Sequence, residues 1–193
     1  MSASKVPAAE LLFPATVGRD REAVLAAAEA EVLVWFDTLA PSLRRYACSF
    51  GVESEAADDV VQEVFVALFR HLALRRPRQN LRAWLFRVAH HRALKHQARR
   101  RRRQRDEADW DAARLELVAD PAANPEQRLS WGRRARRLRV ALHAMPERDR
   151  QCLFLRAEGL TYRDIAHTLD ISLGGVAKAL VRAIARLSAA DRN

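Results

Sequence analysis

The side chains best suited to chemistry are basic, and they are concentrated in one stretch of the chain. From Val64 to Arg105 the sequence holds fourteen of its 34 lysines and arginines and no aspartate or glutamate. Cations at this density bind phosphates, which supply much of the affinity of proteins for nucleic acids. The net charge of +10 alone fits a nucleic acid, an anionic membrane surface or plain solubility. Its concentration in an acid-free stretch favours a polyanionic partner.

A second set of polar side chains is acidic and precedes the basic stretch. The segment 46–69 contains no lysine or arginine. Within it, Asp59, Gln62 and Glu63 are spaced i, i+3 and i+4, so on a helix they share one face with the preceding Asp58 beside them. Such a face suits a basic protein partner, although a merely solvated helix surface would have the same pattern.

Metal and catalytic chemistry find little support. His90, His91 and His96 point to different faces of a helix, and Cys48 and Cys152 match no metal or redox spacing. The sequence has no phosphate-binding loop, no GxSxG motif and no carboxylate pair with an evident pocket. We therefore expect no metal, no cofactor and no enzymatic activity. Without a signal peptide or a long apolar run, we expect a cytoplasmic protein that does not insert into a membrane.

The elements that must position these residues are predicted to be helices. Glycine is scarce, with six residues, and no stretch alternates as a half-buried strand does. The predicted fold is all-α, with two small helical domains joined by a flexible linker: a tail at 1–20, a first domain at 21–105, an acidic linker at 106–130 and a second domain at 131–193. A first helix starting near Arg21 is expected to break at Pro41, and Ser54 and Asn80 are expected to cap the next two.

The second domain carries a helix-turn-helix pattern over 161–187. Thr161 can cap a short helix, and Ser172 can cap a longer one after a tight turn. This arrangement places the second helix in the DNA major groove, although an ordinary helical hairpin is the alternative. Near the start of that helix only Lys178 is basic, so Arg163 and the later arginines resemble phosphate contacts more than base-reading residues.

Three stretches of the sequence occur in a distinctive order. They are ADDVVQEVFV at 57–66, RAWLFRVA at 82–89 followed by the arginine run, and MPERDRQCLFLRAEGLTYRDIAHTLDIS at 145–172. In this order and spacing they resemble the bacterial RNA polymerase sigma factors of the sigma-70 family, in its extracytoplasmic-function (ECF) group. With the helices around them they cover roughly 30–105 and 135–188.

The resemblance implies that the two domains are sigma regions 2 and 4, and it implies a partner for each polar surface. RNA polymerase core, through its beta-prime clamp helices, would contact Asp58, Asp59, Gln62 and Glu63. The minus-10 promoter element would be bound and opened by Arg78, Asn80, Arg82, Arg87, His91, Arg92, Lys95 and Arg99. The minus-35 element would be bound by Thr161, Arg163, Ser172, Leu173, Gly174, Gly175, Lys178, Arg182 and Arg186. The beta flap of the polymerase, promoter DNA and an anti-sigma factor complete the implied partners, the last of them left open.

Several positions depart from the family's usual residues. His91 stands where asparagine is common and Lys95 where aspartate is common. In the recognition helix Gly175 replaces the usual threonine, and Ala177 and Ala179 replace a lysine and an arginine. These changes concern promoter preference and the strength of minus-35 recognition and leave the fold prediction intact.

Trp84 has two interpretations within the basic helix. An aromatic ring there could stack on an unpaired base. Its spacing with Leu85 and Val88 favours a position in the core instead.

The sequence thus predicts a sigma factor that binds RNA polymerase core and directs promoter recognition and DNA opening. Two other classes stay open: a helix-turn-helix regulator that never joins polymerase, and an adaptor bound mainly to another protein. The acidic face at 58–63 discriminates against the regulator, because a simple repressor has no need of it.

Overall fold

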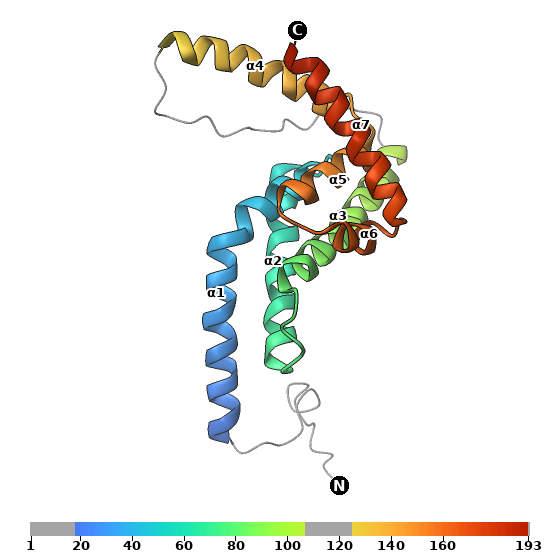
Figure 1. The fold of residues 1–193 in the computed structure, drawn as a ribbon. Helices are drawn as coiled ribbons and strands as arrows, with labels where there is room; N and C mark the ends of the chain where they lie inside the picture. The colour runs from blue at the N-terminus through green and yellow to red at the C-terminus, as the bar shows by residue number, and fades with distance from the viewer. Residues whose placement is uncertain (1–17, 107–124, 193) are drawn as a thin grey trace.

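Seven helices and no strand make up the residues that the computed structural model describes, 18–106 and 125–192 (Figure 1). They are α1 (Gly18–Cys48), α2 (Ser54–Ala73), α3 (Leu81–Asp106), α4 (Pro125–His143), α5 (Glu147–Ala157), α6 (Tyr162–Leu169) and α7 (Leu173–Arg192). The predicted all-α class is confirmed. None of these helices is both long enough and apolar enough to cross a membrane.

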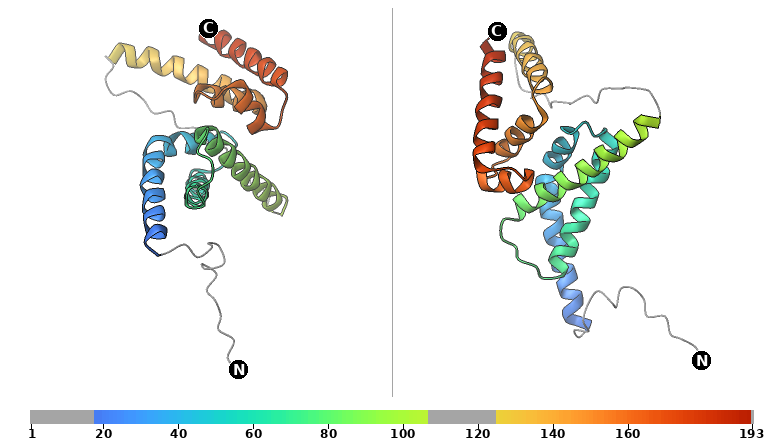
Figure 2. Two further views of the ribbon diagram at one scale, coloured as in Figure 1. Left: turned by 60° about the horizontal axis from the view of Figure 1, so that its bottom comes forward. Right: turned by 90° about the vertical axis from the view of Figure 1, so that its right-hand side faces the viewer.

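The helices form an N-terminal domain, α1–α3, and a C-terminal domain, α4–α7. Figures 1 and 2 show α5 and α6 lying against α1 and α3, with α4 and α7 on the far side of them. Most of the expected tail and most of the expected linker fall outside the described residues. Where the chain is described again, α4 begins at Pro125, inside the segment 106–130 that we predicted as linker.

The break predicted at Pro41 is wrong, because α1 continues from Gly18 to Cys48 with the proline inside it. The ribbon of α1 bends near its C-terminal end instead (Figures 1 and 2). Proline removes one backbone hydrogen bond and its ring crowds the preceding turn, which kinks a helix. Leu39 and Leu43 on either side are fully buried, so packing holds both halves of the bent helix in place.

The predicted helix caps hold in the second domain but not in the first. Thr161 forms a reciprocal capping box with Asp164 at the start of α6, and the Ser172 hydroxyl accepts a hydrogen bond from the Gly175 amide at 3.0 Å. By contrast, Ser54 is the first residue of α2 rather than its cap. Asn80 has a φ of 55°, in the left-handed region, so it does not have the extended backbone of an N-cap residue.

One buried cluster joins the two domains around Tyr46. Its ring centroid lies 5.6 Å from that of Phe86 on α3 and 5.4 Å from that of Phe154 on α5. The Tyr46 hydroxyl lies 3.1 Å from Nδ1 of His90, which is also buried. The domains therefore share an apolar core and are not merely tethered, and burying these aromatic rings supplies much of the contact energy.

Polar contacts surround this cluster. The Arg150 guanidinium on α5 donates to the Ser49 carbonyl at the end of α1, at 2.9 and 3.2 Å. The Gln97 amide on α3 donates to the Phe50 carbonyl at 3.2 Å. These donors satisfy backbone carbonyls of the turn that follows α1.

The buried His90 gives the fold a specific pH dependence. Burial lowers the pKa of His90 from 6.5 to about 4, and the neighbouring His91 adds to the shift. In the unfolded chain the imidazole takes up a proton near pH 6.5, whereas in the folded chain it does so only near pH 4. Folding free energy is therefore lost as the pH falls through this window, by as much as about 3 kcal/mol.

We expect urea unfolding between pH 7 and pH 4.5 to show this loss in the wild type and a smaller one in His90→Gln, which keeps a hydrogen-bonding group but does not titrate. The comparison uses the change in the free energy of unfolding between the two pH values. A loss of stability that is the same at every pH therefore does not affect it. Equal slopes in the two proteins would contradict the assignment.

Candidate polymerase and nucleic-acid interfaces

The residues predicted to dock on polymerase lie together on α2. They are Asp58, Asp59, Gln62 and Glu63, of which the first three are exposed. Asp58 accepts a hydrogen bond from Nε of Arg44 at 2.8 Å, and Glu63 forms an ion pair with Arg92 at 2.9 Å. Asp59 is therefore among the more accessible charges of this face, whereas Glu63 already links α2 to α3.

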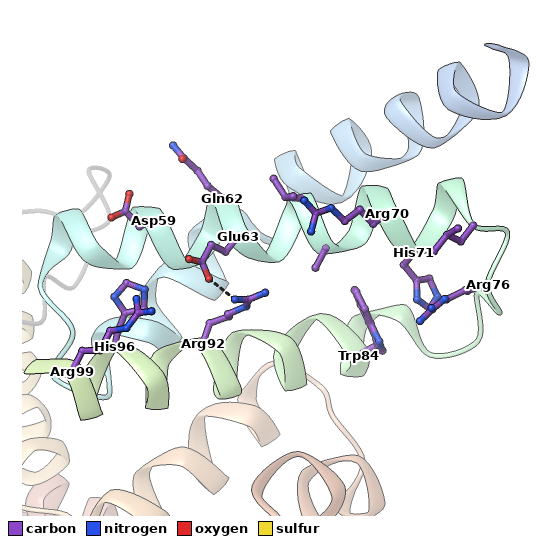
Figure 3. Close-up of a pocket in the computed structure, with 13 residues that line it drawn as sticks. Asp59, Gln62, Glu63, Arg70, His71, Arg76, Trp84, Arg92, His96 and Arg99 are labelled. Carbon is purple, nitrogen blue, oxygen red and sulfur yellow. Dashed lines mark ion pairs between the residues drawn. The ribbon is translucent and has the colours of Figure 1, made fainter. Parts of the chain in front are cut away.

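A groove of about 820 Å³ runs between α2 and α3 beside this acidic face (Figure 3). Its basic lining residues are Arg70, His71, Arg76, Arg92, His96 and Arg99. Figure 3 shows Asp59 and Glu63 projecting from α2, with the Glu63–Arg92 ion pair spanning the two helices. The groove thus carries acidic groups on α2 and cations on α2, on α3 and in the loop between them. The cations could bind the phosphates of a nucleic-acid strand along the groove.

The position of Trp84 fits both interpretations that the sequence left open for it. It is half-buried and packs against the core, yet it also lines the groove. Its ring centroid lies 4.6 Å from that of His71, with an angle of 44° between the planes (Figure 3). The two rings place an aromatic surface among the cations of the groove, as proteins that bind single strands do.

Four of the basic groove residues are not among the individual residues predicted to contact the minus-10 element, namely Arg70, His71, Arg76 and His96. Arg76 lies in the loop between α2 and α3, and its side chain reaches the groove only because the loop folds back there. A partial signal did exist on α3, because Trp84, Arg92, His96 and Arg99 recur at intervals close to whole helical turns.

Three of the residues predicted to bind the minus-10 element face the C-terminal domain instead of the groove. Asn80 donates to a carboxylate oxygen of Asp164 at 2.6 Å, and Arg82 pairs with Glu158 at 2.9 Å. Arg87 lies in hydrogen-bonding contact with His167. We call Asn80, Arg82 and Arg87 the α3 flank.

The other predicted minus-10 residues are distributed over different surfaces. Arg78 pairs with Glu31 of α1 at 3.1 Å. His91 and Lys95 are exposed on α3, while Arg92 and Arg99 line the groove. The structure thus brings only Arg92 and Arg99 of the predicted set together in the groove.

The predicted minus-35 residues on and beside α6 and α7 differ in their surroundings. Leu173, Gly174, Lys178 and Arg186 are exposed, as is Arg163. Thr161 and Ser172 are the capping residues described above. A Cβ at Gly175 would lie 3.3 Å from the Ser172 hydroxyl oxygen, so this glycine leaves room for the cap.

Arg182 is tied to the core of the C-terminal domain. Its guanidinium donates to both carboxylate oxygens of Asp149 on α5, at 2.6 and 2.9 Å. The Asp149 side chain is only 1% exposed, and the hydrogen bonds from Arg182 hold the pKa of this carboxyl below its usual range. Such a bidentate pair is strong and geometrically specific, so this arginine joins α7 to α5.

Comparison with known protein families gives two matches along the chain. Residues 35–103 match the model of sigma-70 region 2, and residues 135–187 match that of sigma-70 region 4. The first match covers α2, almost all of α3 and the later part of α1. The second covers the helix-turn-helix and most of the rest of the C-terminal domain.

Curated relatives are similar over most of their lengths. The chain is 31% identical over 150 residues to the ECF RNA polymerase sigma factor EcfG of Rhodopseudomonas palustris (strain TIE-1), covering 77% of this chain and 78% of the relative. It is 32% identical over 152 residues to the RNA polymerase sigma factor CnrH of Cupriavidus metallidurans, covering 77% and 80%.

Two solved structures share the fold. One is the sigma factor RpoE in complex with the anti-sigma factor NepR from Bartonella quintana, with a TM-score of 0.64 at 22% identity, covering 80% of this chain and 92% of that one. The other is CnrH in complex with the cytosolic domain of CnrY, with a TM-score of 0.55 at 24% identity, covering 88% and 95%.

The Arg182–Asp149 pair predicts a stability effect that a DNA-contact role alone would not produce. Arg182→Ala removes two hydrogen bonds to the buried Asp149 carboxylate, and we expect the midpoint of urea unfolding to fall. Lys178→Ala, which removes an exposed cation of the same helix, is the matched control and should change the midpoint far less. Urea denaturation measures both, and equal losses would contradict a structural role for Arg182.

Proposed function

The chain belongs to the ECF group of the sigma-70 family of RNA polymerase sigma factors, and from this premise we propose how its surfaces divide the work. It is a sigma factor, which binds RNA polymerase core and directs transcription initiation at promoters. We propose that the acidic α2 face binds the beta-prime clamp helices. The groove and α3 would bind and open the minus-10 element, and α7 would contact the minus-35 element while its domain meets the beta flap.

The arrangement of charge around the groove is the observation that supports this assignment of partners to surfaces. Asp59 and Glu63 line the groove from α2, and Arg92 and Arg99 line it from α3. A basic protein partner on the α2 side and a nucleic-acid strand on the α3 side would therefore bind next to each other. A regulator that never joins polymerase would need the DNA-binding surface only, which leaves the acidic face and the region 2 match unexplained.

The minus-10 surface has the components that strand opening requires. Separating and flipping bases costs a few kcal/mol, which cations along the backbone and stacking on aromatic rings can offset. The groove supplies Arg92 and Arg99 for the backbone, and the Trp84–His71 pair for stacking.

The minus-35 surface offers little for reading base edges. Lys178 is the exposed cation nearest the start of α7, and Leu173, the first residue of this helix, is 52% exposed. An exposed leucine can contact a thymine methyl group, but it donates no hydrogen bond. We propose that α7 supports positioning through Lys178 and Arg186 more than sequence discrimination.

An anti-sigma factor is a further partner that we propose for this chain. Two sigma factors with the same fold were solved as complexes, one with the anti-sigma factor NepR and one with the cytosolic domain of CnrY. Because polymerase core and promoter DNA are the working partners, we propose that the protein acts in the cytoplasm.

The experiment that tests the function is run-off transcription with core polymerase and a library of genomic promoter fragments. We expect a restricted set of transcripts that depends on the added chain. The start sites would then supply a promoter for the variants below. No transcript above the level of core polymerase alone would contradict the proposal.

Charge reversal on α2 tests the polymerase surface. Asp59→Lys should weaken co-purification with core polymerase at least tenfold, because a cation would face a basic partner. Glu29→Lys adds the same charge at an exposed position of α1 and is the control. We leave Glu63 unchanged because it also pairs with Arg92. Unchanged binding of the Asp59 variant to core would refute this docking face.

Removing cations from the groove tests DNA opening. The double variant Arg92→Ala, Arg99→Ala should bind core polymerase normally but give weaker permanganate reactivity of thymines in the promoter. Arg148→Ala, an exposed arginine on α5 outside the proposed DNA surfaces, should open DNA as the wild type does. A groove variant that melts the promoter normally would show that strand opening occurs elsewhere.

A further inference from the structure

Helix α2 ends in a turn that directs the following loop back toward the groove. The Arg75 amide donates to the Leu72 carbonyl at 2.8 Å and the Arg76 amide donates to the His71 carbonyl at 3.1 Å, which is the hydrogen-bond pattern of a Schellman motif. Arg75 has a φ of 51°, in the left-handed region where glycine is the usual residue. A side chain disfavours this conformation, so it persists where further contacts hold the turn.

His71 supplies one of these contacts through its ring. Its Nε2 lies 2.8 Å from the Pro77 carbonyl oxygen. A carbonyl oxygen can only accept a hydrogen bond, so Nε2 carries the hydrogen and donates it. The ring is itself packed against Trp84, with 4.6 Å between the two ring centroids. His71 thus holds the loop twice, through its own carbonyl to the Arg76 amide and through its ring to the Pro77 carbonyl.

The loop is stiff around these two hydrogen bonds. Pro77 has a fixed φ, and it also restricts the backbone of Arg76 before it. Arg78, the next residue, forms an ion pair with Glu31 of α1 at 3.1 Å. The loop is therefore attached to α1 as well as to α2, and the backbone of Arg76 is held close to both attachments.

This attachment places the Arg76 side chain in the groove, which it lines together with His71 and Trp84. Figure 3 shows these three residues at one end of the groove and Arg99 at the other. Among the residues that the structure describes, Arg76 forms no ion pair, whereas Arg92 has one. The guanidinium of Arg76 is thus available to an anion that enters the groove.

We propose that His71 is a positioning residue for strand binding, which holds Arg76 in the groove where its guanidinium can bind a phosphate. A cation on a stiff loop loses less conformational entropy on binding than one on a free loop, so it contributes more to affinity. The phosphate would belong to the strand whose base stacks on Trp84. The inference rests on the proposed role of the groove in opening the minus-10 element. It adds Arg76 as a strand contact and His71 as the residue that orients it.

A double-mutant cycle between His71 and Arg76 in the holoenzyme tests the proposal. His71→Phe keeps an aromatic ring against Trp84 but removes the hydrogen bond to Pro77. His71→Gln keeps an amide donor in place of Nε2 and removes the ring. The rate of opening is measured by permanganate reactivity of thymines, on a promoter obtained from the run-off experiment. Co-purification with core polymerase shows that each variant is folded.

We expect Arg76→Ala to slow promoter opening about fivefold in the wild type and in the His71→Gln background. In the His71→Phe background it should slow opening by less than about twofold, because the loop no longer holds the guanidinium in place. Arg99→Ala, at the other end of the groove, is the matched control and should slow opening by the same factor in all three backgrounds. A general loss of stability would not produce this difference between the two arginines.

Equal effects of Arg76→Ala in the wild type and in the His71→Phe background would overturn the proposal, and so would no effect in the wild type. Loss of the Arg76 effect in both His71 backgrounds would also contradict it, because the donor to Pro77 would then not be what holds the loop. A wild-type holoenzyme that gives no transcript contradicts the proposed function. One that opens the promoter, with independent effects of His71 and Arg76, contradicts the positioning role alone.

Discussion

The contact on which the rest of the structure depends is the packing of Tyr46 between three helices. Its ring lies at the end of α1 and meets Phe86 on α3 and Phe154 on α5. Its hydroxyl meets His90, which burial keeps neutral at physiological pH. Because these groups belong to both domains, the orientation of the helix-turn-helix against α3 is set by a core and not by the chain connection.

This orientation determines what the basic helix can do. Arg92 and Arg99 on α3 look into the groove shared with α2, while Asn80 and Arg82 look toward α5 and α6. A helix whose charges are spread around its circumference can serve several partners, and its neighbours decide which charges are available. Here one side of α3 remains open for a strand and another is closed by carboxylates of the same chain.

Much of the function could be predicted from particular residues. The spacing of Asp59, Gln62 and Glu63 placed them on one face of α2, and Thr161 and Ser172 marked the starts of α6 and α7. Pro41 misled because its local preference to end a helix was overridden by tertiary packing of Leu39 and Leu43. The local signals at Thr161 and Ser172 therefore held, whereas those at Pro41, Ser54 and Asn80 did not.

By itself, the sequence determined the all-α class, the order of the sigma motifs and the separation of acidic from basic segments, since these follow from periodicity and residue type. Only the tertiary structure decided which arginines are available. Arg182 and Arg186 are indistinguishable as arginines four residues apart, and both are exposed, yet Arg182 donates two hydrogen bonds to the buried Asp149 carboxylate. Likewise, nothing near Arg82 in the chain indicates Glu158. The reason is that ion pairs form between residues that folding brings together, 33 and 76 positions apart in these two cases.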